Sequence, residues 1–141
     1  SNAVDSADIF FNTNANQLIH VGLEDVSNNS SFTSFTTTIH ARKGGKGNAS
    51  VNIRVQTSGG DLLSSHNITV NTVGVSVYTT PSTSLSFNTS VANGLQLRIL
   101  GTDNTQCFYT EAFVTLTGTT SSGLIKLNSG LTQLTSGKIT L

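Results

Sequence analysis

Apolar and polar residues alternate with a period of two along most of this chain, and such alternation predicts β-strands. The clearest case is the stretch 51–56, where Val51, Ile53 and Val55 would point to one face and the residues between them to the other. The same pattern predicts further strands over the ranges 9–11, 18–23, 32–42, 62–70, 73–77, 85–91, 95–100 and 106–117.

Turn residues separate these predicted strands. Gly59-Gly60-Asp61 is typical of a hairpin, Asn93-Gly94 is typical of a type I′ turn, and the segment 43–48 is rich in glycine. Seven to nine strands, with turn signals at short intervals and no stretch of helical periodicity, predict an all-β fold. We expect an antiparallel β-sandwich or jelly roll.

The last long strand, 106–117, carries apolar residues at both phases of the alternation. Its even positions, which include Phe108, Val114 and Leu116, are expected to form one face. Its odd positions are mixed and include Cys107. We expect this strand to be covered on both sides for part of its length.

The chain ends in a seven-residue repeat whose units open with a Ser-Gly pair, at Ser122, Ser129 and Ser136. The leucine spacing alone would allow a coiled coil. One glycine per unit argues against it, because glycine costs roughly 1 kcal/mol relative to alanine in a helix. We therefore predict three extended segments separated by glycine turns. The repeat contains the leucines Leu124, Leu127, Leu131, Leu134 and Leu141.

Three parts are expected along the chain: an N-terminal arm over 1–8, a β-sandwich domain over 9–117 and the repeat tail over 118–141. Residues 1–3, Ser-Asn-Ala, are typical of the scar left when an expression tag is removed, or they are native. The tail cannot bury its leucines alone, so these must lie against the domain or against another copy of the chain.

Composition narrows the possible partners. Only 10% of the residues are charged, the formal net charge is zero and the pI is near 6.8, so electrostatic attraction to nucleic acid or to an anionic membrane is not expected. No apolar run reaches the roughly 18 residues of a membrane span, so no membrane insertion is expected. A chain rich in Asn, Ser and Thr and poor in charge is associated with an extracellular, cell-surface or virion-surface location.

Residues that could carry chemistry are scattered. The three histidines, His20, His40 and His66, fall on separate predicted strands at polar positions, so we expect them to face solvent. Their spacing matches no metal motif. Asp103-Asn104 leaves a weak calcium site open as an alternative. We expect no enzymatic activity, no metal and no cofactor.

Two further features have a structural and a functional interpretation. Cys107, the single cysteine, is expected to be buried as a small hydrophobic residue, with an intermolecular disulfide as the alternative. The turn that holds Arg42, Lys43 and Lys46 lacks the spacing of a phosphate-binding loop. It is a solvated hairpin tip, or it binds an acidic glycan or the acidic patch of a partner.

A resemblance extends over about a quarter of the chain. The runs Leu-Ser-Phe at 85–87, Leu-Arg-Ile-Leu-Gly-Thr at 97–102 and Cys-Phe at 107–108 resemble the C-terminal strands of endospore-appendage subunits, which are small jelly-roll proteins that stack into fibres. The resemblance implies a structural, pilin-like subunit in which Cys107 accepts an intermolecular disulfide.

Two functions are therefore expected from the sequence. The first is a non-catalytic extracellular structural subunit that self-assembles into a fibre or surface layer through terminal strand addition, so that its partners are copies of itself. The alternative is a receptor- or glycan-binding head or shaft module of a viral or phage fibre. The candidate donor residues for strand addition are Ile9, Phe10 and Phe11 near the N-terminus, together with the leucines of the tail.

Overall fold

A computed structural model of the chain describes residues 11–13, 18–22, 30–120, 123–131 and 138–140, with side chains described for Leu18 and for residues 31–118. These residues form eleven strands and one short helix: β1 (Phe11–Thr13), β2 (Leu18–Gly22), β3 (Ser30–Lys43), β4 (Ala49–Gln56), β5 (Leu62–Val70), β6 (Ser76–Thr79), β7 (Thr83–Asn88), α1 (Thr89–Asn93), β8 (Gln96–Gly101), β9 (Cys107–Thr120), β10 (Gly123–Leu131) and β11 (Lys138–Thr140).

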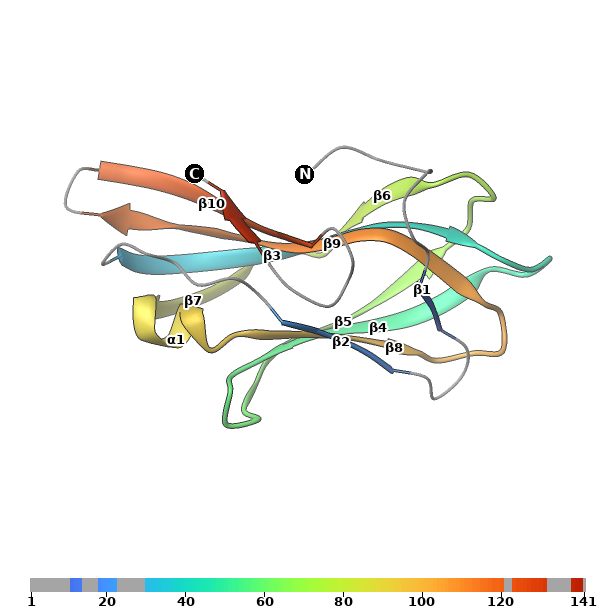
Figure 1. The fold of residues 1–141 in the computed structure, drawn as a ribbon, viewed down its shortest axis with the longest axis horizontal. Coiled ribbons are helices and arrows are strands. Elements are labelled where there is room, and N and C mark those ends of the chain that lie inside the picture. The colour runs from blue at the N-terminus through green and yellow to red at the C-terminus, as the bar shows by residue number, and fades with distance from the viewer. Residues whose placement is uncertain (1–10, 14–17, 23–29, 121–122, 132–137, 141) are drawn as a thin grey trace.

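The strands form two antiparallel sheets that pack face to face (Figure 1). Sheet A has the order β11-β10-β9-β3-β6, with β1 also paired to β9 and β7 also paired to β3. Sheet B has the order β2-β8-β4-β5. The predicted all-β sandwich is therefore confirmed, whereas the jelly-roll topology stays a prediction.

The two longest strands, β3 and β9, pair along the middle of sheet A. Each has 14 residues, and their register runs from Ser30 opposite Thr120 to Lys43 opposite Cys107. β3 carries β7 along its first half and β6 along its second half, while β9 carries β10 and β1 on its other side. Every other strand of sheet A except β11 thus pairs directly with β3 or β9.

The register of the β3–β9 pair shifts at two places, once at Thr33 in β3 and once, by a β-bulge, in β9. His40 lies opposite Glu111 and Ala41 lies opposite Tyr109, which leaves Thr110 as the extra residue in β9. The bulge reverses which residues of β9 face the core: Cys107 and Tyr109 belong to the core before it, and Ala112, Val114 and Leu116 belong to it after. The single even-numbered face predicted for this strand is therefore wrong, because alternation alone does not reveal an inserted residue.

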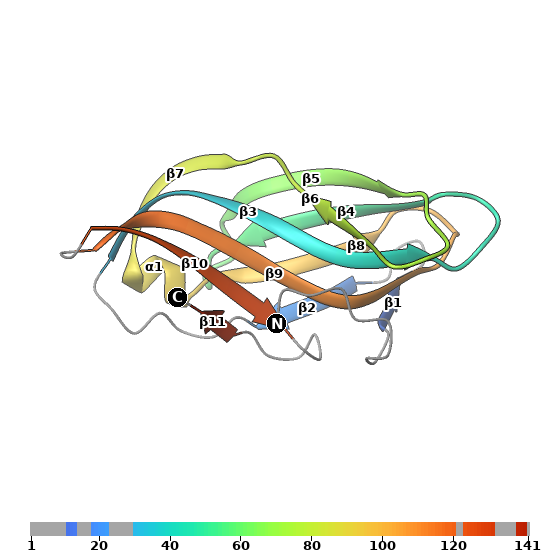
Figure 2. The ribbon, with the colours of Figure 1, turned by 90° about the horizontal axis from the view of Figure 1, so that it is seen from above.

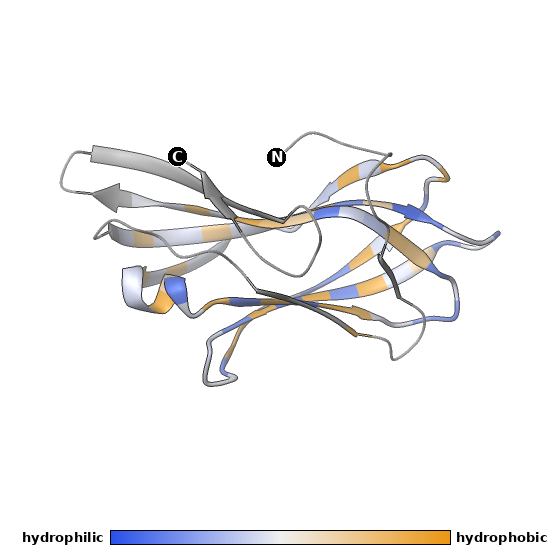
Figure 3. Cartoon of the chain, in the orientation of Figure 1, coloured by the Kyte–Doolittle hydropathy of each residue, from blue (hydrophilic) through white to orange (hydrophobic). Residues whose placement is uncertain are grey.

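The hydrophobic core lies between the sheets, and Figure 3 shows apolar and polar residues alternating along the strands that enclose it. Val51, Ile53 and Val55 of β4 are buried in it, as the alternation predicts, and so are Leu97 and Ile99 of β8. β9 is buried on both faces from Tyr109 to Leu116, which confirms the expected coverage on both sides.

Of the two tight turns predicted from the sequence, the hairpin is confirmed and the type I′ turn is wrong. The hairpin at residues 59–61 is confirmed: the Thr57 N–H donates to the Asp61 carbonyl at 2.9 Å, and Gly60 has a φ of +92° that glycine tolerates. The type I′ turn at residues 93–94 is wrong. Asn88 caps α1 by accepting a hydrogen bond from the Val91 N–H at 3.0 Å, and Gly94 follows the helix with a φ of −96°.

The predicted strand at 73–77 is wrong in its first part. β6 begins only at Ser76, and Val73, which the alternation assigned to a strand, is 77% exposed. Residues 71–75 form the connection from β5 to β6, where the Thr72 hydroxyl donates to the Gly74 carbonyl at 2.9 Å. A local side-chain bond of this kind favours a turn over a strand.

The described part of the tail is extended, but the turn predicted at Ser129-Gly130 is wrong, because β10 continues through both residues. β10 pairs with β9 in register from Gly123 opposite Thr120 to Leu131 opposite Ala112, and β11 pairs with β10. The tail segment thus adds two strands to sheet A. The docking role predicted for it stays a prediction.

We expect Gly118→Ala to destabilise the protein by about 2 kcal/mol, because a Cβ at this position would collide with the Ser31 carbonyl oxygen and would lie 2.7 Å from the Phe32 Cα. The matched control is Gly74→Ala, where nothing lies within 4 Å of the added carbon. Urea unfolding of both variants measures the difference. Equal stability of the two would show that β3 and β9 do not pack this closely.

Candidate functional site

The most open feature of the fold is the free edge of sheet B. β5 pairs with β4 on one side only, so the backbone groups on its other side have no strand partner among the described residues. The strand is nine residues long and contains no proline and no lysine, arginine or carboxylate. Proline and charged side chains are two of the features by which proteins block pairing at an edge. A β-bulge is a third, and β5 has one near its start, at Leu63.

On the same side of the sandwich, sheet A offers less room for strand addition. Its edge there consists of two short strands, β6 and β7, and Pro81 lies between them. Thr80 fastens this gap to β3, since its N–H donates to the Thr37 carbonyl at 2.8 Å and its hydroxyl accepts from the Thr37 N–H at 2.9 Å. Among the described strands on this side, β5 is the longest, and its edge is regular after the bulge at Leu63.

The core itself is incompletely covered on this side. All three strands on this side carry apolar side chains that pack against the core but remain partly exposed. They are Leu63 and Ile68 on β5, Tyr78 on β6 and Leu85 on β7. At the start of β5, Leu62 is 57% exposed. We call β5, β6 and β7 together the open side.

The strands contributed by the two ends of the chain lie on the opposite side of the sandwich. Figure 2 shows β5 and β7 along one side of the molecule and β1, β2 and β11 along the other, in agreement with the order of strands in each sheet. The open side and the terminal strands therefore face in opposite directions.

Four of the eight residues predicted as strand donors lie in the part of the chain that the structure describes. Phe11 lies in β1 opposite Tyr109, and Leu124, Leu127 and Leu131 lie in β10 opposite Thr119, Leu116 and Ala112. The remaining four lie outside the described residues: Ile9, Phe10, Leu134 and Leu141.

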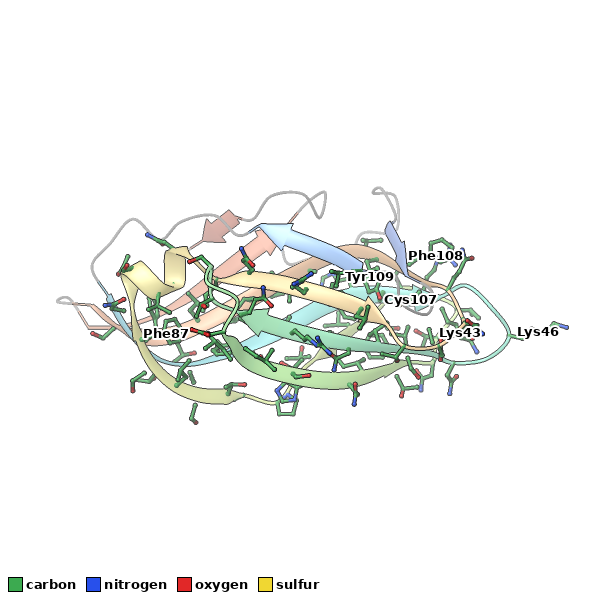
Figure 4. The ribbon with its side chains drawn as sticks, turned by 90° about the horizontal axis from the view of Figure 1, so that it is seen from below. Lys43, Lys46, Phe87, Cys107, Phe108 and Tyr109 are labelled. Atoms are coloured by element: carbon green, nitrogen blue, oxygen red, sulfur yellow. The ribbon has the colours of Figure 1, made fainter. Side chains whose placement is uncertain are left out.

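The basic turn does not present its three charges as one cluster. The guanidinium of Arg42 lies 4.4 Å from the centre of the Phe108 ring, a cation–π contact. Lys43 donates to the Lys46 carbonyl at 3.3 Å. Figure 4 shows Lys46 at the outer tip of the turn. The structure thus leaves Lys46 extended, whereas Arg42 packs against the body of the domain.

Cys107 is buried between the sheets, as expected for a small hydrophobic residue. Desolvation by burial raises the pKa of its thiol from 9.0 to about 11; a hydrogen bond with Tyr109 opposes this shift and the negative charge of Asp103 adds to it. A thiol in this state is a poor nucleophile. A disulfide to another copy would require the sulfur to be uncovered first.

The raised pKa predicts how stability depends on pH. Because the folded thiol holds its proton more tightly than the unfolded one, its contribution is complete below about pH 9 and is lost as the pH rises to about 11. Relative to Cys107→Ala, the native protein should lose roughly 2 to 3 kcal/mol of unfolding free energy over this interval. Urea titrations of both proteins at several pH values test this, and a constant difference would contradict it.

His40 corrects the expectation that the histidines face solvent. Its side chain is only 1% exposed, and its Nδ1 lies 3.1 Å from Oε2 of Glu111, at ion-pair distance but without hydrogen-bond alignment. The ring also meets Phe113 edge to face. The alternation placed His40 correctly on the face away from the core, but it could not show that this face of sheet A is covered here.

Asp103, the residue of the calcium alternative, has a structural role. One carboxylate oxygen accepts from the Ser50 N–H at 2.9 Å and the other accepts from the Thr105 N–H at 3.0 Å. These bonds hold the β8–β9 connection against β4. Among the described residues no group of three His, Cys, Asp or Glu side chains is placed to hold a metal ion.

The outer face of sheet B carries a polar cluster that no sequence motif indicates. Arg54 of β4 lies directly opposite Arg98 of β8, and Ser65 of β5 lies on the other side of Arg54. One row away, Asn52 lies opposite Asn67. The only sequence signal was that these residues occupy polar phases, and the alternation does not say which strands are neighbours.

Comparisons with models of known protein families, with curated proteins and with solved structures found no match. No helix in the part of the chain that the structure describes is long and apolar enough to span a membrane.

Proposed function

We propose that this chain is a non-catalytic structural subunit that assembles into a fibre, in which an extended terminal segment of one copy adds to the free β5 edge of the next. The observation that carries the proposal is the free edge of β5 on the open side of the sandwich, a nine-residue strand without proline, lysine, arginine or carboxylate. An edge strand without proline or charged side chains does not oppose the approach of another strand, so it favours strand addition.

Strand addition has two sources of affinity here. The backbone groups along β5 supply main-chain hydrogen bonds to an incoming strand, and pockets for its alternate side chains set its register. The partly covered core side chains Leu63, Ile68 and Leu85 supply the apolar contact, since an added strand would remove more of their surface from water. A donor with apolar residues at intervals fits this site, and both chain ends contain such residues.

The geometry of the contact favours an open fibre over a closed ring. Donor strands and acceptor edge lie on opposite sides of the sandwich (Figure 2), so the contact joins two different surfaces. Such a heterologous contact propagates as a filament unless its rotation closes. We place the fibre outside the cell or on a virion surface, in keeping with the composition and with the resemblance to appendage subunits.

We expect Leu62→Lys/Thr69→Lys to reduce filament formation at least tenfold, because two charges at the ends of β5 oppose strand addition. Both positions are exposed, so the fold should tolerate them. The matched control is Ser58→Lys/Thr102→Lys, which adds the same charge at two exposed loop residues. Light scattering and negative-stain microscopy measure the filaments, and urea unfolding checks that both variants fold.

Equal assembly by the two double variants would contradict the proposal. A closed trimer formed by the native chain would also contradict it and would favour the head module of a viral or phage fibre. Peptides covering residues 1–13 and 118–141, each with a scrambled control, identify the donor: the peptide from the exchanged end should stop elongation by occupying β5.

A further inference from the structure

We propose that the outer face of sheet B binds an acidic glycan, with Arg54 and Arg98 holding its carboxylate or sulfate group. This site is separate from the β5 edge, because it lies on the face of the sheet and uses side chains, whereas strand addition uses backbone groups. The inference therefore stands independently of fibre assembly.

The two arginines lie side by side on neighbouring strands. Arg54 and Arg98 are directly opposite in the register of β4 and β8, and side chains so placed start about 5 Å apart and point to the same face. Like charges in this arrangement destabilise a sheet. An anion between them would turn this repulsion into two favourable contacts.

No carboxylate neutralises this pair within the described part of the chain. Of the three acidic residues there, Asp103 accepts backbone hydrogen bonds in its loop, Glu111 lies beside His40 in sheet A, and Asp61 lies in the turn after β4. Nε of Arg98 is buried and makes no hydrogen bond to the described residues. The described carboxylates therefore leave the positive charge of the Arg54–Arg98 pair uncompensated.

The neighbouring side chains hold one arginine in place. Nε of Arg54 donates to Oδ1 of Asn52 at 2.6 Å. Asn52 is fixed in turn, because its amide nitrogen donates to the Ser65 hydroxyl at 3.0 Å and to Oδ1 of Asn67 at 2.9 Å. With Nε occupied, the terminal nitrogens of Arg54 remain to bind an oxyanion, for which the planar guanidinium is well shaped.

Amide groups flank the arginines on both sides along the strands. Asn52 and Asn67 form one row, and Gln56, which donates to Gln96 at 3.0 Å, forms the other. The rows are four residues apart along β4, or roughly 13 Å. Amides donate and accept hydrogen bonds, as sugar hydroxyls require. The face thus combines one anion site with neutral polar groups around it.

This combination fits a glycan better than a nucleic acid. A nucleic acid needs a row of basic residues along its phosphates, and the described side chains of this face include only two. They include no aromatic side chain on which a base could stack. An acidic sugar carries its carboxylate or sulfate among hydroxyl groups, which suits one anion site flanked by amides.

The test is binding of the full chain to heparin, polygalacturonate and dextran, measured by isothermal titration calorimetry. We expect binding to heparin, polygalacturonate or both, which tells a sulfate from a carboxylate, and none to neutral dextran. Arg54→Gln/Arg98→Gln should weaken binding at least tenfold, whereas Lys43→Gln/Lys46→Gln, which removes the same charge from the basic turn, should stay within twofold. Added salt should weaken the binding by screening.

Two further measurements distinguish a specific anion site from nonspecific charge attraction. Arg54→Lys/Arg98→Lys keeps the charge but loses the planar fork, so it should bind several-fold more weakly than the native chain. The glutamine variant should unfold at the same or a higher urea concentration, because the repulsion is gone. The proposal is overturned if dextran or single-stranded DNA binds as well as the acidic glycans, if neither acidic glycan binds, or if the two glutamine variants behave alike.

Discussion

The pairing of β3 with β9 is the interaction on which the rest of the structure depends. Their register extends over the full 14 residues of both strands, and most of the core side chains of sheet A project from this pair. The close approach at Gly118 and the bulge at Thr110 fix how the two strands lie against each other. Because the bulge reverses the phase of β9, it places Tyr109 and Ala112 in the same core.

The strands that flank this central pair also determine which side of the sandwich keeps a free sheet edge. On one side, β9 is extended by β10, β11 and β1, and on the other side β3 carries only the short strands β6 and β7. Sheet B ends on that second side with β5, whose length exceeds that of either strand facing it. The sandwich thus has a built-up side and an open side, and the proposed assembly joins one to the other.

The sequence predicted the parts of the fold that depend on local alternation. The inward phases of β4 and β8 are correct because Val51, Ile53 and Leu97 are buried on one face and their neighbours lie at polar phases. The helix at Thr89–Asn93 was not predicted, because two local signals conflict there. Asn88 can cap a helix, whereas Asn93-Gly94 is typical of a hairpin turn, and the sequence alone does not show which one holds.

The candidate sites could not be predicted in the same way, because they depend on which strands are neighbours. Arg54 and Arg98 are 44 positions apart in the chain and become adjacent only in the β4–β8 register. His40 and Glu111 meet only in the β3–β9 register. The free edge of β5 is likewise a property of the sheet order. Composition and the terminal repeats indicated self-assembly, but they did not indicate the accepting edge.

Hydrogen–deuterium exchange of β5 in the free subunit and in the assembled fibre tests the central claim most directly. Strand addition predicts that amides between Leu62 and Val70 become protected in the fibre, while those of β4, already paired on both sides, change little. Equal exchange of β5 in both states would contradict the account.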